Sequence, residues 1–296
     1  MYSVLISHYS TVFRFVNSFF ARRLTAAHGR TIMVQIMEVG PVWKLILLDL
    51  DGTLLRSDKT ISPRTLAVLA RCREKGCAIA VCTARGASNA AQYVARVQPD
   101  FVVSSGGALV QAGGETLYCS AFSAEETARL VQEGLRLTGG AEITVDTMTH
   151  HYWNYRQDPR RIAPDWNDVV YTDYRGFCEP ALKISVQTES ETVARQIAAC
   201  VADCDWAPFS DAPLYKFTKA SATKERAIEA IAAATGIAPA QMIAFGDDYV
   251  DLGMLRMCGC GVAMGNAIAA VRQAADDVAG TNDADGVAEY LEKRLL

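Results

Sequence analysis

The chain has 296 residues, of which half are hydrophobic and 21% are charged, and its formal net charge is −4. These totals describe a soluble globular protein with enough apolar material for a sizeable core, and the length favours two domains. The acidic balance excludes a general binding surface for nucleic acid or another polyanion, although a single small anion site is compatible with it.

The first forty residues differ in composition from the rest. They contain four arginines, and their first acidic residue is Glu38. Such a segment could be amphipathic and lie on a membrane surface or direct targeting, but polar residues interrupt it too often for a membrane-spanning helix. The preferred interpretation is an extension over residues 1–40, with the folded protein starting near Met33 or Met37.

Beyond this segment, apolar strands alternate with helices. Three continuous apolar runs predict strands buried on both faces, namely KLILLDL, CAIAVCT and FVVSS. Ser62 as N-cap, Pro63 in the first turn and Gly76 beyond the end predict a helix after the first strand. A second helix is expected over roughly residues 86–96. This order predicts a parallel, doubly wound α/β sheet.

The pattern then changes to that of an α+β insert. The stretch ALVQAGGETLYCS predicts a β-hairpin around Gly113–Gly114, and Ser123 with Glu126 has the spacing of a helical capping box. Short alternating stretches follow, together with a helix near residues 189–202. We therefore expect an inserted cap domain over residues 116–213.

The alternating pattern of helices and parallel strands returns with a helix from Ala222, and the chain ends with a helix over ADGVAEYLEKRLL. The strands QMIAFGDD and GCGVAM lie between them, with a helix from about residue 248. Residues 41–115 and 214–296 should thus form one core domain that the cap interrupts. The nine cysteines, an odd number without a CxxC pair, indicate reduced thiols of a cytosolic, cytoplasmic protein.

Polar residues directly follow four of the predicted core strands: Asp49 with Asp51, Thr83, Ser104 with Ser105, and Asp247 with Asp248. Active groups of an open parallel sheet gather beyond the carboxyl ends of its strands, so we expect these side chains to meet. Converging carboxylates repel one another unless a cation lies between them. Mg²⁺ suits a shell of carboxylate, water and phosphate oxygens.

Phosphoryl transfer fits these groups, because it needs neutralised charge and an in-line nucleophile. Asp49 can attack phosphorus to form an aspartyl-phosphate. Asp51 can protonate the leaving alkoxide and then accept a proton from water. Thr83 can hydrogen-bond the transferring oxygens, and Lys224 adds a positive charge.

The metal shell is completed by Asp247, and Asp251, one helical turn later, can support it. Taken singly, each of these residues has a more ordinary explanation as a turn residue, a helix cap or a solvated charge. Their placement at successive strand ends favours the joint functional interpretation.

Four motifs resemble those of the haloacid dehalogenase-like (HAD) hydrolases: DLDGT, CTARG, ATKERAI and GDDYVDLGML. Over about residues 44–296 the chain is similar to the Cof-type phosphatases, whose large C2B cap (subclass IIB) lies between the second and third motifs. The resemblance implies a HAD core with an inserted α+β cap, and Mg²⁺-dependent hydrolysis of sugar phosphates or similar small phosphorylated metabolites.

The resemblance also implies roles for individual residues. The catalytic pair would be Asp49 as nucleophile and Asp51 as acid/base. The metal ligands would be Asp49, Asp51 through its main-chain carbonyl, and Asp247. The phosphate would be bound by Thr83, Arg85 and Lys224, with Asp248 and Asp251 in support.

Three positions depart from the family pattern. Val250 replaces the asparagine of GDxxND, Ala84 replaces the glycine of TGR, and Gly106 replaces the asparagine of Asn-Gly-Ala. No nucleophile, acid or metal ligand is lost. The departures bear on how the phosphate and the leaving group are oriented, and therefore on rate and substrate choice.

Residues of the cap are candidates for substrate contacts, because a cap of this type closes over the site. The stretch DTMTHHYWNYRQDPRR contains His150, His151, Tyr152, Trp153, Arg156, Arg160 and Arg161. For any one of them, an aromatic core with a solvated basic loop is the favoured interpretation. Lys216 and Lys219 could be confused with the catalytic lysine, but Lys224 opens the helix before the fourth motif.

Other functions stay open at this point. A phospho-receiver domain lacks the second aspartate of DxD and the cap. A low-activity or inactive HAD-fold regulatory protein and a phosphomutase are further alternatives. We expect a small phosphorylated metabolite as partner, no nucleic acid or membrane, and a monomer or weak homodimer.

Overall fold

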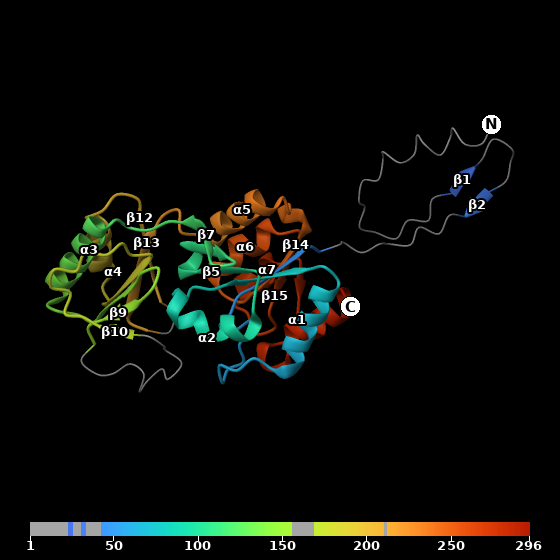
Figure 1. Ribbon diagram of the computed structural model, residues 1–296, viewed down its shortest axis with the longest axis horizontal. Helices are drawn as coiled ribbons and strands as arrows, with labels where there is room; N and C mark the ends of the chain where they lie inside the picture. The colour runs from blue at the N-terminus through green and yellow to red at the C-terminus, as the bar shows by residue number, and fades with distance from the viewer. Residues whose placement is uncertain (1–22, 26–30, 34–42, 156–168, 210–211) are drawn as a thin grey trace. The chain divides into compact units, whose positions relative to one another are not determined.

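The computed structural model describes residues 23–25, 31–33, 43–155, 169–209 and 212–296 (Figure 1). The chain divides into two compact units, Met1–Val42 and Trp43–Leu296. In the first unit, β1 (Arg23–Thr25) pairs antiparallel with β2 (Thr31–Met33), and the rest of the expected extension lies outside the described residues. None of the described helices has the length and apolar character needed to cross a membrane.

The core of the second unit is a mixed sheet, and its described strands run in the order β16-β15-β14-β3-β4-β5-β6-β7. The strands are β3 (Leu45–Leu48), β4 (Ala78–Cys82), β5 (Phe101–Ser104), β6 (Leu109–Ala112), β7 (Glu115–Cys119), β14 (Met242–Gly246), β15 (Cys260–Ala263) and β16 (Asp277–Val278). Neighbours from β16 to β5 are parallel, whereas β6 and β7 are antiparallel. Every side chain of β3 is buried, which explains its continuous apolar sequence.

Helices before, between and after the strands complete the doubly wound core that the sequence predicted. They are α1 (Pro63–Glu74), α2 (Ala87–Val97), α5 (Lys224–Thr235), α6 (Leu252–Met257), α7 (Ala269–Ala274) and α8 (Gly286–Arg294). Ser62 caps α1 by accepting a hydrogen bond from the backbone N–H of Thr65, and Pro63 is the first helical residue, as predicted. Short 3₁₀ turns occur at η1 (Ser105–Gly107), η3 (Pro239–Gln241), η4 (Tyr249–Asp251) and η5 (Asn282–Ala284).

A second sheet forms the cap, with its described strands in the order β10-β9-β8-β11-β13-β12. The strands are β8 (Ile143–Asp146), β9 (His151–Trp153), β10 (Val169–Tyr171), β11 (Lys183–Gln187), β12 (Cys204–Pro208) and β13 (Leu214–Lys219). Helices α3 (Ala124–Thr138) and α4 (Glu191–Ala198) lie together beside this sheet (Figure 1). The predicted capping box of Ser123 and Glu126 is confirmed at the start of α3.

Sheet membership suggests where the domains divide. The predicted hairpin around Gly113–Gly114 is confirmed, since Ala112 of β6 pairs with Glu115 of β7. Strand β7 thus belongs to the core sheet, whereas β13 belongs to the cap sheet. We therefore propose that the cap spans about residues 120–220, in place of the expected 116–213.

Candidate active site

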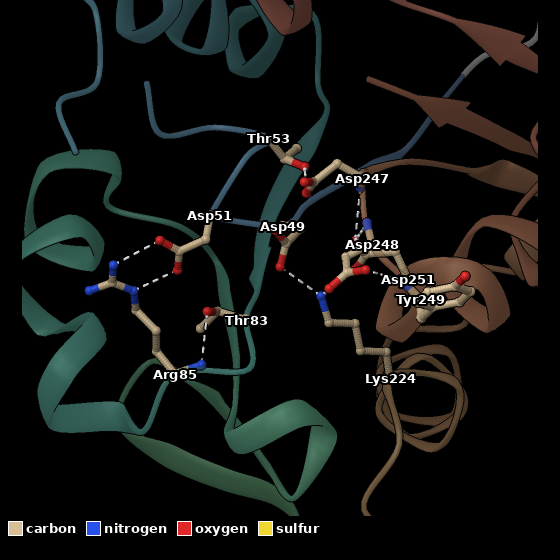
Figure 2. Close-up of polar contacts among 10 residues, drawn as sticks. All are labelled: Asp49, Asp51, Thr53, Thr83, Arg85, Lys224, Asp247, Asp248, Tyr249 and Asp251. Carbon is tan, nitrogen blue, oxygen red and sulfur yellow. Dashed lines mark hydrogen bonds and ion pairs between the residues drawn. The ribbon is translucent and has the colours of Figure 1, made fainter. Parts of the chain in front are cut away.

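The candidate site lies at the carboxyl ends of β3, β4 and β14, which are neighbours in the core sheet (Figure 2). Asp49 follows β3, Thr83 follows β4 and Asp247 follows β14. Lys224 is the first residue of α5, so its side chain reaches the same place from the side. The predicted convergence of these residues is therefore present in the structure.

Lys224 connects two carboxylates inside the core. Its Nζ donates to Oδ1 of Asp49 at 2.8 Å and to Oδ1 of Asp251 at 2.6 Å. Burial lowers the pKa of Lys224, but Asp251 and Asp49 together raise it well above its usual value. Lys224 is therefore a permanent cation at neutral pH.

Asp49 is 6% exposed, and burial raises its pKa more than the Lys224 ammonium lowers it. Asp251 and Asp247 raise the pKa of Asp49 further through charge repulsion. A nucleophile must be ionised, and burial of Asp49 opposes that form. A second cation beside the cluster would favour it.

The cluster has the composition of a metal site. Within the part of the chain that the structure describes, carboxylate oxygens of Asp49, Asp247 and Asp251 lie within 4.8 Å of one another. Both oxygens of Asp251 are already engaged, because Oδ2 accepts from the backbone N–H groups of Asp247 and Asp248 at 2.9 and 3.2 Å. This bonding suits Asp251 to support rather than to direct ligation.

Asp247 has more freedom to bind a cation. Thr53 Oγ1 donates to its Oδ1 at 3.0 Å. Burial raises the pKa of Asp247 to about 6, against the lowering effect of the Thr53 hydrogen bond. Gly52 lies directly against this carboxylate, since a Cβ at that position would stand 2.1 Å from Oδ2 of Asp247. Gly52 and Thr53 complete the DLDGT motif, yet the sequence alone did not indicate their contact with Asp247.

Asp51 lies apart from the carboxylate cluster, beside Arg85 (Figure 2), and Lys59 is its second cationic partner. Arg85 donates two hydrogen bonds to Asp51, from Nε to Oδ2 at 2.6 Å and from Nη2 to Oδ1 at 2.8 Å. Lys59 Nζ donates to Oδ1 at 2.7 Å. Burial alone would raise the pKa of Asp51, but Arg85 and Lys59 lower it to about 2.

Arg85, which was predicted to bind phosphate, therefore contacts the predicted acid/base in this structure. Its guanidinium also lies 5.1 Å from the centre of the Tyr93 ring. The backbone N–H of Arg85 donates to Thr83 Oγ1 at 3.0 Å, and Thr83 is 1% exposed. A phosphate-binding role of Arg85 stays a prediction.

Two of the three departures from the family pattern have local explanations, whereas nothing in the structure explains Val250. Ala84 is absent from the residues with positive φ, so the backbone there does not require glycine. Gly106 has φ +72°, a conformation that glycine adopts without strain. Val250 lies in η4, between Asp251 and the exposed Tyr249, and Asp248 caps this turn by accepting from the N–H of Tyr249.

The cap candidates fall into different environments. Tyr152 donates to Glu179 and packs against Phe177, whereas His150 is exposed. His151 bonds Asp146 through Nδ1 and is buried, as is Trp153. Arg156, Arg160 and Arg161 lie outside the described residues. Lys219 pairs with Glu126, away from the carboxylate cluster, which leaves Lys224 as the lysine at Asp49.

Comparison with known proteins agrees with this geometry. The family model of haloacid dehalogenase-like hydrolases matches residues 46–291. The 5-amino-6-(5-phospho-D-ribitylamino)uracil phosphatase YitU of Bacillus subtilis is 30% identical over 275 residues, which cover 87% of this chain and 98% of YitU.

Solved structures share the fold. A haloacid dehalogenase-like hydrolase from Bacteroides thetaiotaomicron has a TM-score of 0.74 at 26% identity, with 85% of this chain and 99% of that chain covered. The HAD subclass IIB sugar phosphatase BT4131 has a TM-score of 0.72 at 23% identity, with 84% and 98% covered. The chain therefore belongs to the haloacid dehalogenase-like hydrolases and, within them, to the Cof-type phosphoric monoester hydrolases.

Proposed function

We propose that this protein is a Mg²⁺-dependent phosphatase of small phosphorylated metabolites that acts through an aspartyl-phosphate on Asp49. The observation that carries the proposal is the buried group in which Asp49 contacts Lys224 and shares a cluster with Asp247. This group combines a nucleophile, a fixed cation and carboxylate oxygens of the kind that Mg²⁺ prefers.

The residues present fit a magnesium ion. The excess of carboxylates over ammonium groups, together with the raised pKa of Asp247, indicates a place for a further cation. Asp49, Asp247 and the main-chain carbonyl of Asp51 would hold it. When bound, the ion supplies neutralisation of charge on the phosphoryl oxygens.

The first step transfers the phosphoryl group to Asp49. Its carboxylate forms a bond to phosphorus while the bond between phosphorus and the leaving oxygen breaks. Asp51 supplies a proton to that oxygen. Lys224 and Thr83 hold the transferring oxygens.

The second step releases phosphate. Asp51, now a carboxylate, takes a proton from water as the water attacks phosphorus, and Asp49 is set free. The Arg85–Asp51 pair holds Asp51 in its proton-accepting form. To donate in the first step, Asp51 must separate from Arg85 and Lys59 when the substrate binds and take up a proton from the phosphate monoester monoanion or from water.

Names of relatives support small metabolites as substrates. YitU is named for a phosphorylated ribitylaminouracil, and BT4131 is titled a sugar phosphatase. We extend this class, and no single compound, to the present chain. Cytoplasmic location and a monomeric or weakly dimeric state stay predictions.

Hydrolysis of an aryl phosphate with and without Mg²⁺ tests the proposal. Excess EDTA should abolish turnover, and added Mg²⁺ should restore it. Asp247→Asn should raise the Mg²⁺ concentration needed, whereas Glu229→Gln, which removes an exposed carboxylate paired with Arg226, is the control. Full activity in EDTA would contradict the proposal, and a requirement for a sugar bisphosphate activator would indicate a phosphomutase instead.

A further inference from the structure

The cap sheet has one apolar and one polar face, because side chains alternate along each strand. Ile143, Val145, Ile184 and Phe217 belong to the hydrophobic cluster of the cap. On the opposite face, strand register aligns polar residues into two rows. The anchored row consists of His151, Asp146 and Lys183, and the open row consists of Trp153, Thr144, Ser185 and Lys216.

The anchored row places this face against the catalytic loop. Lys183 Nζ lies 2.8 Å from Asp146 Oδ2 and donates to the backbone oxygen of Ala84 at 2.8 Å. A Cβ on Gly86 would stand 2.5 Å from Oδ1 of Asp146. Since Ala84 and Gly86 flank Arg85, the polar face of the cap meets the loop that carries two of the predicted phosphate-site residues.

The open row has donors without protein acceptors. Within the described residues, no hydrogen bond or ion pair involves the side chains of Thr144, Ser185 or Lys216. Trp153 is 5% exposed, and its indole N–H has no partner there either. Among these donors, only the Trp153 N–H is fully buried, so the polar atoms of Thr144, Ser185 and Lys216 are open to water or to the acceptors of a ligand.

Lys216 carries the positive charge of the open row, and no ion pair within the described residues neutralises it. Burial lowers its pKa, and repulsion from Lys183 and Lys224 lowers it further, with only partial compensation from Asp205 and Asp248. Lys216 pairs in register with Ser185 and so lies on the same face of the cap sheet as Lys183, whose ammonium group contacts the catalytic loop at Ala84. Lys183, by contrast, is neutralised by Asp146.

We propose that the open row is a subsite for an anionic group, a carboxylate or a second phosphate, on the leaving part of the substrate. Lys216 is the residue that selects this anion, and Ser185 and Thr144 add hydrogen bonds. The inference rests on the proposed function, because it places the reacting phosphate at Asp49 and Lys224.

Matched substrate pairs test the subsite. Glucitol 6-phosphate and 6-phosphogluconate differ only in a hydroxymethyl or carboxylate group at one end. Fructose 6-phosphate and fructose 1,6-bisphosphate probe a second phosphate in the same way. We expect kcat/KM to favour at least one anionic member by about 10- to 100-fold, the value of a hydrogen bond to a charged group. The pair that shows the preference identifies which anion is recognised.

Variants assign the preference to Lys216. Lys216→Met should abolish it while leaving kcat/KM for the neutral member within about twofold. Lys216→Glu should reverse it. Lys219→Met, whose ammonium group is already paired with Glu126, is the control and should keep it.

The possible outcomes distinguish a failure of the subsite from a failure of the proposed function. No preference in the wild type, or an equal loss on both members in Lys216→Met, overturns the subsite while turnover of an aryl phosphate upholds the proposed function. If the wild type hydrolyses neither these compounds nor the aryl phosphate, the proposed function is overturned and the subsite with it. Melting temperatures of the variants separate a loss of fold from a loss of recognition.

Discussion

Lys224 and Asp49 are 175 positions apart in the sequence, yet Nζ of the lysine lies 2.8 Å from Oδ1 of the aspartate in a buried ion pair. The pair forms because α5 starts beside the end of β3, after the whole cap has been inserted between them. The catalytic group of the core is thus assembled across the cap. A variant without the cap would keep this ion pair only if its linker still placed the start of α5 beside the end of β3.

Gly52 provides a steric test of the metal site. Gly52→Ala would put a Cβ 2.1 Å from Oδ2 of Asp247, so the carboxylate must move. A displacement of about 1 Å in a catalytic site can cost about 100-fold in rate. We expect a loss of about this size in kcat/KM, together with a higher Mg²⁺ requirement, in a metal titration of activity.

Gly106→Ala is the matched control. Gly106 has φ +72°, close to the +76° of Gly52, but nothing lies within 4 Å of its Cβ position. Both variants share a backbone strain of about 1–2 kcal/mol, and only Gly52→Ala meets Asp247. Equal Mg²⁺ requirements in the two variants would show that the Asp247 contact is unimportant.

Asp146 links stability to pH. Burial would raise its pKa, but Lys183 and His151 hold the pKa well below the usual value. Because the pKa is depressed in the folded state, the stabilisation is complete above the unfolded pKa of about 4 and is lost as the pH falls below it. Asp146→Asn should cost about 3–5 kcal/mol in unfolding free energy at neutral pH, as for a broken buried pair.

Denaturant unfolding at pH 7 and pH 3 measures this effect. The difference between wild type and Asp146→Asn should shrink at the lower pH. Glu191→Gln removes a carboxylate from an exposed pair with Arg195 and should cost less than about 1 kcal/mol. A difference that stays constant down to pH 3 would show that ionised Asp146 does not stabilise the fold.

Val250 replaces a residue that could orient the nucleophile or the phosphate. Valine offers no side-chain hydrogen bond, and a missing bond to a charged group costs roughly one to two decades in rate. Val250→Asn should therefore raise kcat about 10-fold or more and change KM little. Tyr249→Asn, at the neighbouring exposed position, should give no gain. A slower Val250→Asn enzyme would indicate that valine is adapted to the natural substrate.

Local sequence signals predicted the core accurately where they were strong. The apolar run of β3, the Ser62 cap and the Gly113–Gly114 hairpin are each determined by neighbouring residues. Strands β12 and β13 were not predicted, although Tyr215 and Phe217 alternate with Lys216 and Thr218 along β13. This alternation indicates a strand only when it is known which face of the cap sheet is apolar and which is polar.

The sequence predicted which residues gather in the site, but it predicted fewer of the hydrogen bonds between them. Asp49, Asp247 and Lys224 follow strand ends or open a helix, so topology alone brings them together. The Arg85–Asp51 fork depends on how two loops fold against each other, and no spacing rule indicates it. The contact of Arg85 with Asp51 therefore became visible only in the structure.

Covalent phosphorylation of Asp49 is the central claim, and rapid acid quenching followed by peptide mass analysis tests it most directly. During turnover, the peptide that contains Asp49 should gain the mass of one phosphoryl group. Asp51→Asn should accumulate more of this species, because its second step lacks a proton acceptor. Asp49→Asn should accumulate none and lose essentially all turnover. Steady hydrolysis with no phosphate on that peptide, or with substantial activity left in Asp49→Asn, would contradict the account and indicate direct attack by water.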